Sequence, residues 1–175
     1  MKRLSAFAAA ALIATALAAP AQADEPTIVR DISVHNVISD PDACGDFGVV
    51  WDINLTVDVF TFFDSDGVRV RQLAHIREDN TITNTATGLT LREGPDSFLQ
   101  TTYFLPGGTG VDYIVATGLQ ARVGNELMDV GRVVLEPLGA GRFDLVFNAG
   151  QHPIREAADD GTLVDALSGF CEVLS

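Results

Sequence analysis

The fold is decided by residues 51–63, which read WDINLTVDVFTFF. Apolar and polar side chains alternate from Trp51 to Val59, and a period of two is the pattern of a β-strand with one buried face. The alternation ends at residues 60–63, where both faces become apolar. The segment therefore predicts a half-buried strand, with one of its phenylalanines directed into a lumen or beneath a covering loop.

Turn residues and further strand-like segments lie on both sides of this strand. Residues 64–67 (Asp-Ser-Asp-Gly) predict a hairpin turn, because glycine tolerates positive φ and aspartate bonds its own backbone. Residues 78–80 (Glu-Asp-Asn) predict the next turn. The expected strands cover residues 28–38, 51–63, 68–77, 81–84, 89–92, 98–105, 111–123, 126–136 and 142–148. The two shortest segments form either a pair or one interrupted strand, which leaves roughly eight strands with turns every ~8–12 residues, as in an antiparallel meander.

This pattern predicts a single all-β domain. Eight antiparallel strands with short sequential connections can close into a meander barrel, lipocalin-like or allene-oxide-cyclase-like, that leaves no free edge. A β-sandwich fits the same pattern and is the alternative. Near the C-terminus, apolar residues at helical spacing predict a short helix over residues 162–174.

The N-terminus has the layout of a secretory signal peptide. Lys2 and Arg3 precede an apolar run over residues 4–19, and the small residues of Ala21-Gln22-Ala23 form a cleavage site. We expect residues 1–23 to be removed and residues 24–175 to form the domain. The protein is then secreted and extracellular, with no membrane attachment after cleavage.

The charge of the exported domain is strongly negative. Lys2 is the only lysine, and it leaves with Arg3 in the signal peptide. Removing both from the 11 basic residues leaves nine arginines against 24 acidic residues, a formal net charge of −15. Nucleic acids need clustered positive charge, so we expect no nucleic-acid partner.

Cys44 and Cys171 are the only cysteines. Outside the cytoplasm two cysteines of one domain usually pair, so we expect a disulfide that ties the C-terminal helix to the loop before residue 47. In the chain-entropy picture the bond contributes about 4–5 kcal/mol. A catalytic thiol is disfavoured because neither cysteine has a histidine close in sequence.

The sequence predicts no metal site and no cofactor. Residues 64–67 lack the distal glutamate of a calcium loop, and the glycine-rich residues 107–110 lack the lysine and following helix of a phosphate loop. His35, His75 and His152 lie far apart, whereas zinc ligands usually come in short-spaced pairs. Structural or solvated histidines are the simpler interpretation, although a barrel could gather all three.

The candidate ligand-binding residues are aromatic and charged side chains in or next to the expected strands. They are Phe60, Phe62, His75, Arg77, Tyr103, Tyr113, Asp129 and Arg132. Asp129 and Arg132 stand out because they lie in an otherwise apolar strand, on either side of Gly131. They either orient a polar ligand group near a lumen or form an exterior ion pair of little energetic weight. No catalytic residue is assigned.

Several short motifs resemble those of uncharacterised secreted β-rich proteins of actinobacteria. They are FDSDG at residues 63–67, HIR at 75–77, TNTATG at 83–88, GR at 131–132 and AGQHP at 149–153. The motifs consist mainly of turn residues. The resemblance implies an exported protein without an assigned activity, so no site residue is carried over from it.

Three classes of function are consistent with these features. The first is a binding protein that holds a small hydrophobic molecule, because an excess of phenylalanine suits an apolar site at a barrel mouth. The second is an isomerase- or cyclase-type enzyme on the same barrel, which would act by positioning its substrate. The third is an extracellular interaction or inhibitor domain, with the turn at residues 105–108 as its surface. We expect binding rather than catalysis.

Overall fold

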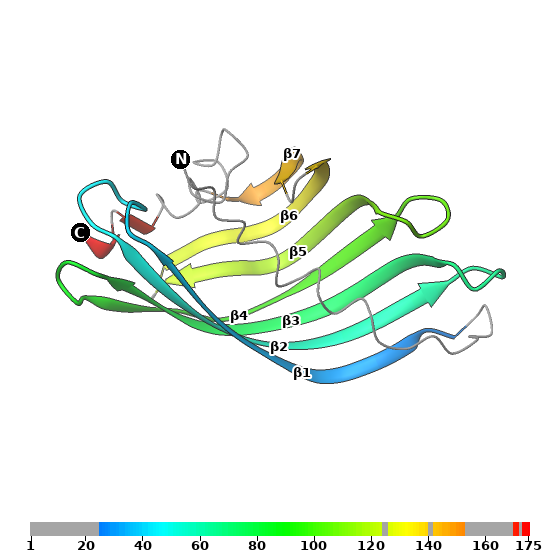
Figure 1. Cartoon of the computed structure of the whole chain (residues 1–175), viewed down its shortest axis with the longest axis horizontal. Helices are drawn as coiled ribbons and strands as arrows, with labels where there is room; N and C mark the ends of the chain where they lie inside the picture. The colour runs from blue at the N-terminus through cyan, green and yellow to red at the C-terminus, as the bar shows by residue number, and fades with distance from the viewer. Residues whose placement is uncertain (1–24, 124–125, 140–141, 153–169, 172) are drawn as a thin grey trace.

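The computed structural model describes residues 25–123, 126–139, 142–152, 170–171 and 173–175. Its seven strands are antiparallel and form one sheet, in which each strand pairs with the next along the chain (Figure 1). The strands are β1 (Thr27–Asp40), β2 (Val49–Phe63), β3 (Arg69–Asn84), β4 (Thr90–Phe104), β5 (Val111–Val123), β6 (Glu126–Gly139) and β7 (Arg142–Gln151). The predicted all-β meander is therefore confirmed.

The strands are fewer and longer than the sequence predicts. Residues 81–84 and 89–92 are the adjoining ends of β3 and β4, and residues 78–80 lie within β3 rather than in a turn. The reason is a bulge, in which Gly94 and Pro95 of β4 lie opposite the single residue Asp79 of β3. The bulge keeps the two strands paired through a segment whose composition is typical of a turn.

The sheet is strongly curved, so it has an inner and an outer face (Figure 1). β1 and β7 are its two edges, and the described residues show no pairing between them. A single sheet is present in this part of the chain, rather than the two sheets of a sandwich. Closure into a barrel stays a prediction.

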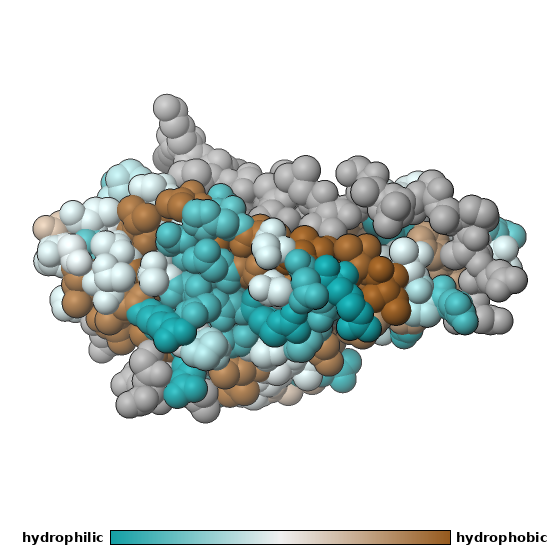
Figure 2. Space-filling model, turned by 90° about the horizontal axis from the view of Figure 1, so that it is seen from below, coloured by the Kyte–Doolittle hydropathy of each residue, from teal (hydrophilic) through white to brown (hydrophobic). Residues whose placement is uncertain are grey.

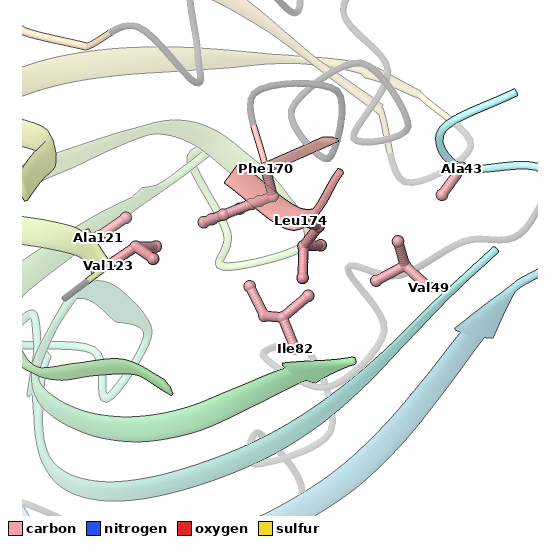
Figure 3. Close-up of a cluster of buried hydrophobic side chains, with 7 residues drawn as sticks. All are labelled: Ala43, Val49, Ile82, Ala121, Val123, Phe170 and Leu174. Atoms are coloured by element: carbon pink, nitrogen blue, oxygen red, sulfur yellow. The ribbon is translucent and has the colours of Figure 1, made fainter. Parts of the chain in front are cut away.

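Two apolar clusters fill the inner face. One is formed by Val57, Val59, Ala74 and Ile76 of β2 and β3. The other includes Ile82 and Val123 and is covered by a helical turn that contains Phe170 and Leu174 (Figure 3). This turn lies at the end of the range 162–174 for which a helix is predicted, while residues 153–169 lie outside the described part of the chain, as does the predicted signal peptide.

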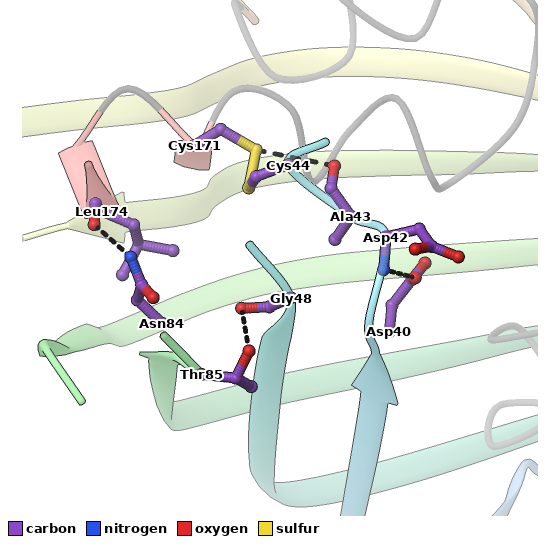
Figure 4. The surroundings of a disulfide bond; sticks show 9 residues. All are labelled: Asp40, Asp42, Ala43, Cys44, Gly48, Asn84, Thr85, Cys171 and Leu174. Atoms are coloured by element: carbon purple, nitrogen blue, oxygen red, sulfur yellow. Dashed lines mark hydrogen bonds between the residues drawn. A yellow bond between two sulfur atoms is a disulfide. The ribbon is translucent and has the colours of Figure 1, made fainter. Parts of the chain in front are cut away.

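The Cys44–Cys171 disulfide is present and joins this helical turn to the loop between β1 and β2 (Figure 4). Beside it, the side-chain amide of Asn84 donates a 3.0 Å hydrogen bond to the carbonyl of Leu174. The hydroxyl of Thr85 donates to the carbonyl of Gly48 at 3.1 Å. Since disulfides persist in oxidising surroundings, the bond indicates a compartment outside the cytoplasm.

Candidate functional site

Strand register places the predicted site residues on the two faces of the sheet. Side chains opposite one another in paired strands share a face, and Asp58, His75, Leu99, Thr117 and Arg132 form one such row on the outer face. A second outer row contains Phe62, Arg71, Tyr103 and Tyr113. Seven of the eight predicted residues lie on this outer face, and Asp129 alone lies on the inner face. The structure therefore brings most of them together, though not in a lumen.

A row of mainly apolar side chains, with Thr101 as its one polar member, lies between these two rows on the outer face and crosses all seven strands. Its members, in register from β1 to β7, are Ile28, Phe60, Leu73, Thr101, Val115, Val134 and Phe147. Ile28 and Phe147 are each 47% exposed at the two ends, and the members between them are half-buried. We call this set the apolar row. Contiguous exposed apolar surface of this kind marks binding sites.

Arginines lie over aromatic rings along this face. The guanidinium of Arg71 is 4.1 Å from the ring centre of Phe62, and that of Arg30 is 5.5 Å from Phe60. Arg132 lies 5.8 Å from the ring centre of Phe147. Among the described residues, none of these three guanidinium groups lies within 4.0 Å of a carboxylate. They are cations without a close ion pair among the described residues, in a chain with a formal net charge of −13.

Tyr103 and Tyr113 form a stacked pair beside Arg71. Their ring centres are 4.4 Å apart and the planes differ by 17°. Burial raises the pKa of Tyr113 above its ordinary value, and the nearby Tyr103 and Asp112 add to the shift. The phenol of Tyr113 therefore stays neutral near pH 7. The stacked pair offers a flat, partly apolar surface with hydroxyl groups at its rim.

Beyond the apolar row lies a charged group centred on Asp58. Its carboxylate accepts hydrogen bonds from the backbone N–H of Asp31 at 2.9 Å and from Arg77 at 3.2 Å. The Asp31 N–H first, and then Arg77, hold the pKa of Asp58 below its usual range. His75 hydrogen-bonds to the hydroxyl of Ser97 at 2.9 Å. Arg77 forms ion pairs with Asp58 and Asp31 in this group.

An open groove of about 660 Å³ adjoins this charged group and is lined in part by His35, Asn54, Arg77 and Ser97. Seen from below, where β1 lies lowest in Figure 1, the surface exposes apolar and strongly polar residues side by side (Figure 2). The exposed Leu105, in the turn predicted as an interaction surface, is 43% accessible.

Asp129 and Arg132 do not form a pair. Asp129 is 2% exposed on the inner face, whereas Arg132 is exposed on the outer face beside Phe147. The enzyme hypothesis would be favoured by His75, Arg77 and Asp129 converging in one cavity. The sheet separates Asp129 from the other two, so these residues do not assemble an active site.

Sequence reasoning missed a polar group on the inner face, between the two apolar clusters. Glu78 of β3 with Glu93 and Asp96 of β4 form this group, and each contributes a carboxylate oxygen within 4.8 Å of the other two. Glu93 and Asp96 are 2% and 3% exposed. We call these three residues the acidic cluster. A Gly-Pro pair flanked by two acidic residues inside a strand signals a bulge, and that was the available clue.

Asn80 supports the acidic cluster from within the sheet. Its amide donates to the carboxylate of Glu93 and to that of Glu78, the latter at 3.3 Å. Its side-chain carbonyl accepts from the backbone N–H of Asn54 at 2.8 Å, which fixes the orientation of the amide. Asn80 is fully buried, and Glu78 is the half-buried member of this network.

The protonation of the acidic cluster reflects its burial. Burial raises the pKa of Glu93 to about 9, and the negative charge of Glu78 adds to the shift. Burial also raises the pKa of Asp96, although the nearby Glu93 carboxyl and the Arg122 backbone oppose that shift. Without a cation, the cluster therefore retains a proton at neutral pH.

His152 lies at the far side of the inner face, against two paired glycines. A Cβ on Gly131 would lie 2.9 Å from its Nε2 atom and only 2.2 Å from the carbonyl oxygen of Ala149, so only glycine fits. The amide of Gln120 donates to the carbonyl of Gly131 at 3.4 Å. His35, His75 and His152 do not form a common site. His35 and His75 lie on the outer face of the sheet, whereas His152 lies on the inner face.

No protein-family model, curated protein or solved structure matches this chain. Among the described residues, no helix has the length and apolar character needed to cross a membrane.

Proposed function

We propose that this chain is an exported, non-catalytic binding protein that takes a small, mainly apolar ligand carrying an acidic group on the outer face of its sheet. The observation that carries the proposal is the apolar row, which crosses all seven strands and is flanked by arginines that have no carboxylate within 4.0 Å among the described residues. Exposed apolar surface favours an apolar ligand body. Guanidinium groups without a close carboxylate in the described part of the chain favour an acidic group on that ligand.

The arrangement of Arg71 supports an acidic ligand rather than a neutral one. Its guanidinium lies over Phe62, and its register neighbour Tyr103 stacks on Tyr113. Stacking on a ring leaves the edge of a guanidinium group available for a carboxylate. A ligand that lay along the apolar row would place its acidic end within reach of Arg71 or Arg132.

A fluorescent fatty acid and its methyl ester test the proposal. The acid should bind the oxidised protein saturably, and more tightly than the ester. Arg71→Gln should weaken binding of the acid about 5- to 10-fold and leave the ester unchanged, because an exposed charge-assisted bond is lost. Arg92→Gln is the matched control, since this exposed arginine pairs with Asp79 away from the apolar row.

Two outcomes would contradict the proposal. One is the absence of saturable binding of either probe at micromolar protein. The other is equal weakening by Arg71→Gln and Arg92→Gln, which would indicate a loss of general attraction rather than of a site. Native mass spectrometry of protein recovered from the culture medium adds a check on export, because cleavage after residue 23 should leave Asp24 as the N-terminus.

A further inference from the structure

Glu93 and Asp96 are the two most deeply buried members of the acidic cluster. In the described part of the chain, no arginine lies within 4.0 Å of a carboxylate oxygen of Glu93 or Asp96. Buried carboxylates are normally paired with a cation or coordinate a metal. Glu93 receives one hydrogen bond from the Asn80 amide, which compensates a single oxygen.

Asp96 supplies a second, independent indication. It is 3% exposed, and neither of its carboxylate oxygens makes a hydrogen bond of normal geometry within the described residues, although the Arg122 backbone and the Glu93 carboxyl lie close enough to lower its pKa. One of these oxygens lies within 4.8 Å of a carboxylate oxygen of both Glu78 and Glu93, so the side chain is directed into the cluster. A buried carboxylate without a partner is costly, which indicates that a bound group completes the site.

The spacing of the oxygens suits a hard divalent ion. Calcium takes oxygen ligands at about 2.3–2.6 Å, so two ligands on opposite sides of one ion are about 4.6–5.2 Å apart. The three carboxylate oxygens of the cluster, all within 4.8 Å of one another, fit around one such ion. The Asn80 amide then acts from outside the site, by orienting Glu78 and Glu93.

We propose that Glu78, Glu93 and Asp96 bind one Ca²⁺ ion on the inner face of the sheet, at the bulge between β3 and β4. The bulge creates the site, because it turns Glu93 and Asp96 to the same side of β4, where Glu78 of β3 joins them. The ion replaces the missing partner of Asp96 and fixes the bulge. The site lies on the opposite face from the apolar row and does not depend on the proposed ligand.

Calorimetric titration with CaCl₂ tests this site in the chelator-treated, oxidised full chain. We expect one ion per chain, with a dissociation constant of about 10⁻⁴–10⁻³ M, as in extracellular calcium modules, and a rise in the melting temperature. Asp96→Asn and Glu93→Gln should each weaken binding about tenfold or more, because each removes one ligand charge. Glu136→Gln, which removes an exposed carboxylate far from the cluster, should bind Ca²⁺ as the wild type does.

The experiments distinguish a folding defect from the loss of the calcium site. Circular dichroism shows whether the variants fold, and Glu78→Gln provides a third variant at a less buried position if the other two do not. No binding by the wild type up to about 10 mM Ca²⁺ would overturn the site. Equal affinity of the wild type and all folded cluster variants would do the same. Fatty-acid binding by the cluster variants reports on the outer face separately, so failure of either proposal can be recognised without the other.

Discussion

Glu93 and Asp96 direct their side chains to the same face of the sheet, although they are three residues apart on one strand. In a regular strand, residues three apart face opposite sides. The register explains the exception, because Asn80 pairs with Glu93 and Glu78 pairs with Asp96, which leaves Gly94 and Pro95 opposite Asp79 alone. The acidic cluster therefore depends on the conformation of two residues that carry no charge.

Gly94→Ala is expected to lower the free energy of unfolding by about 2–3 kcal/mol. Gly94 has φ = +112°, and a Cβ there would lie 2.8 Å from the carbonyl oxygen of Glu78. Urea denaturation, followed by the fluorescence of Trp51, measures the loss. Gly88→Ala is the matched control, because its φ of +74° is also left-handed but its Cβ would meet nothing within 4 Å. The control should cost only about 1 kcal/mol, and equal losses would contradict the steric argument.

Asn84→Ala is expected to cost about 2–3 kcal/mol of stability, since several hydrogen bonds depend on one buried side chain. The side-chain oxygen of Asn84 accepts from the backbone N–H of Ala86 and Thr87, and its amide donates to Leu174. The substitution leaves the Leu174 carbonyl without that donor beneath the C-terminal turn. Urea denaturation measures the effect.

Asn36→Ala serves as the control for this substitution. Asn36 also lies on the inner face, in β1, but its side chain makes no hydrogen bond with the described residues. We expect its replacement to change stability by less than about 0.5 kcal/mol. If Asn36→Ala proved as costly as Asn84→Ala, the link between the β3–β4 hairpin and the C-terminal turn would not be the cause.

Loss of the disulfide is expected to destabilise the protein by about 4–5 kcal/mol in the chain-entropy picture. Cys44 and Cys171 are separated by 127 positions, so the bond removes much freedom from the unfolded chain. The double variant Cys44→Ala/Cys171→Ala should show the loss in urea denaturation. The wild type under reducing conditions should behave like the double variant. Stability equal to that of the oxidised wild type would contradict the prediction.

The sequence was sufficient for the parts of the fold that depend on local pattern. Alternation over residues 51–63 predicted β2, and the cysteine count predicted the disulfide, because both follow from residue type and spacing. Seven of the eight candidate site residues lie on the outer face of the sheet. Their location was not predictable, because which face of a strand turns inward depends on the curvature of the whole sheet.

The acidic cluster shows where sequence reasoning fails. Residues 78–80 and 93–96 are rich in acidic, glycine and proline residues, which usually indicate a turn. Only the pairing of β3 with β4 reveals that both segments lie within strands and face the same interior. Burying carboxylates in a sheet is unfavourable in isolation, so local propensity predicts against the arrangement that is found.

The charged group at Asp58 predicts a specific loss of stability in acid. The backbone N–H of Asp31 and the guanidinium of Arg77 lower the pKa of Asp58 in the folded protein, below the ordinary value of 3.8. The unfolded chain therefore takes up this proton at a higher pH than the folded one. The contribution of Asp58 to stability is fully present above the unfolded pKa and is lost as the pH falls through the folded pKa.

Asp58→Asn isolates this contribution. The amide keeps an acceptor for the Asp31 N–H but removes the charge that faces Arg77. The wild type should be the more stable protein above about pH 5, and its advantage should shrink steadily below about pH 4, as measured by urea denaturation at each pH. Asp66→Asn, at an exposed turn position, should leave the pH profile unchanged. If the difference between wild type and Asp58→Asn stayed constant from pH 7 to pH 2.5, Asp58 would not be held deprotonated by its neighbours.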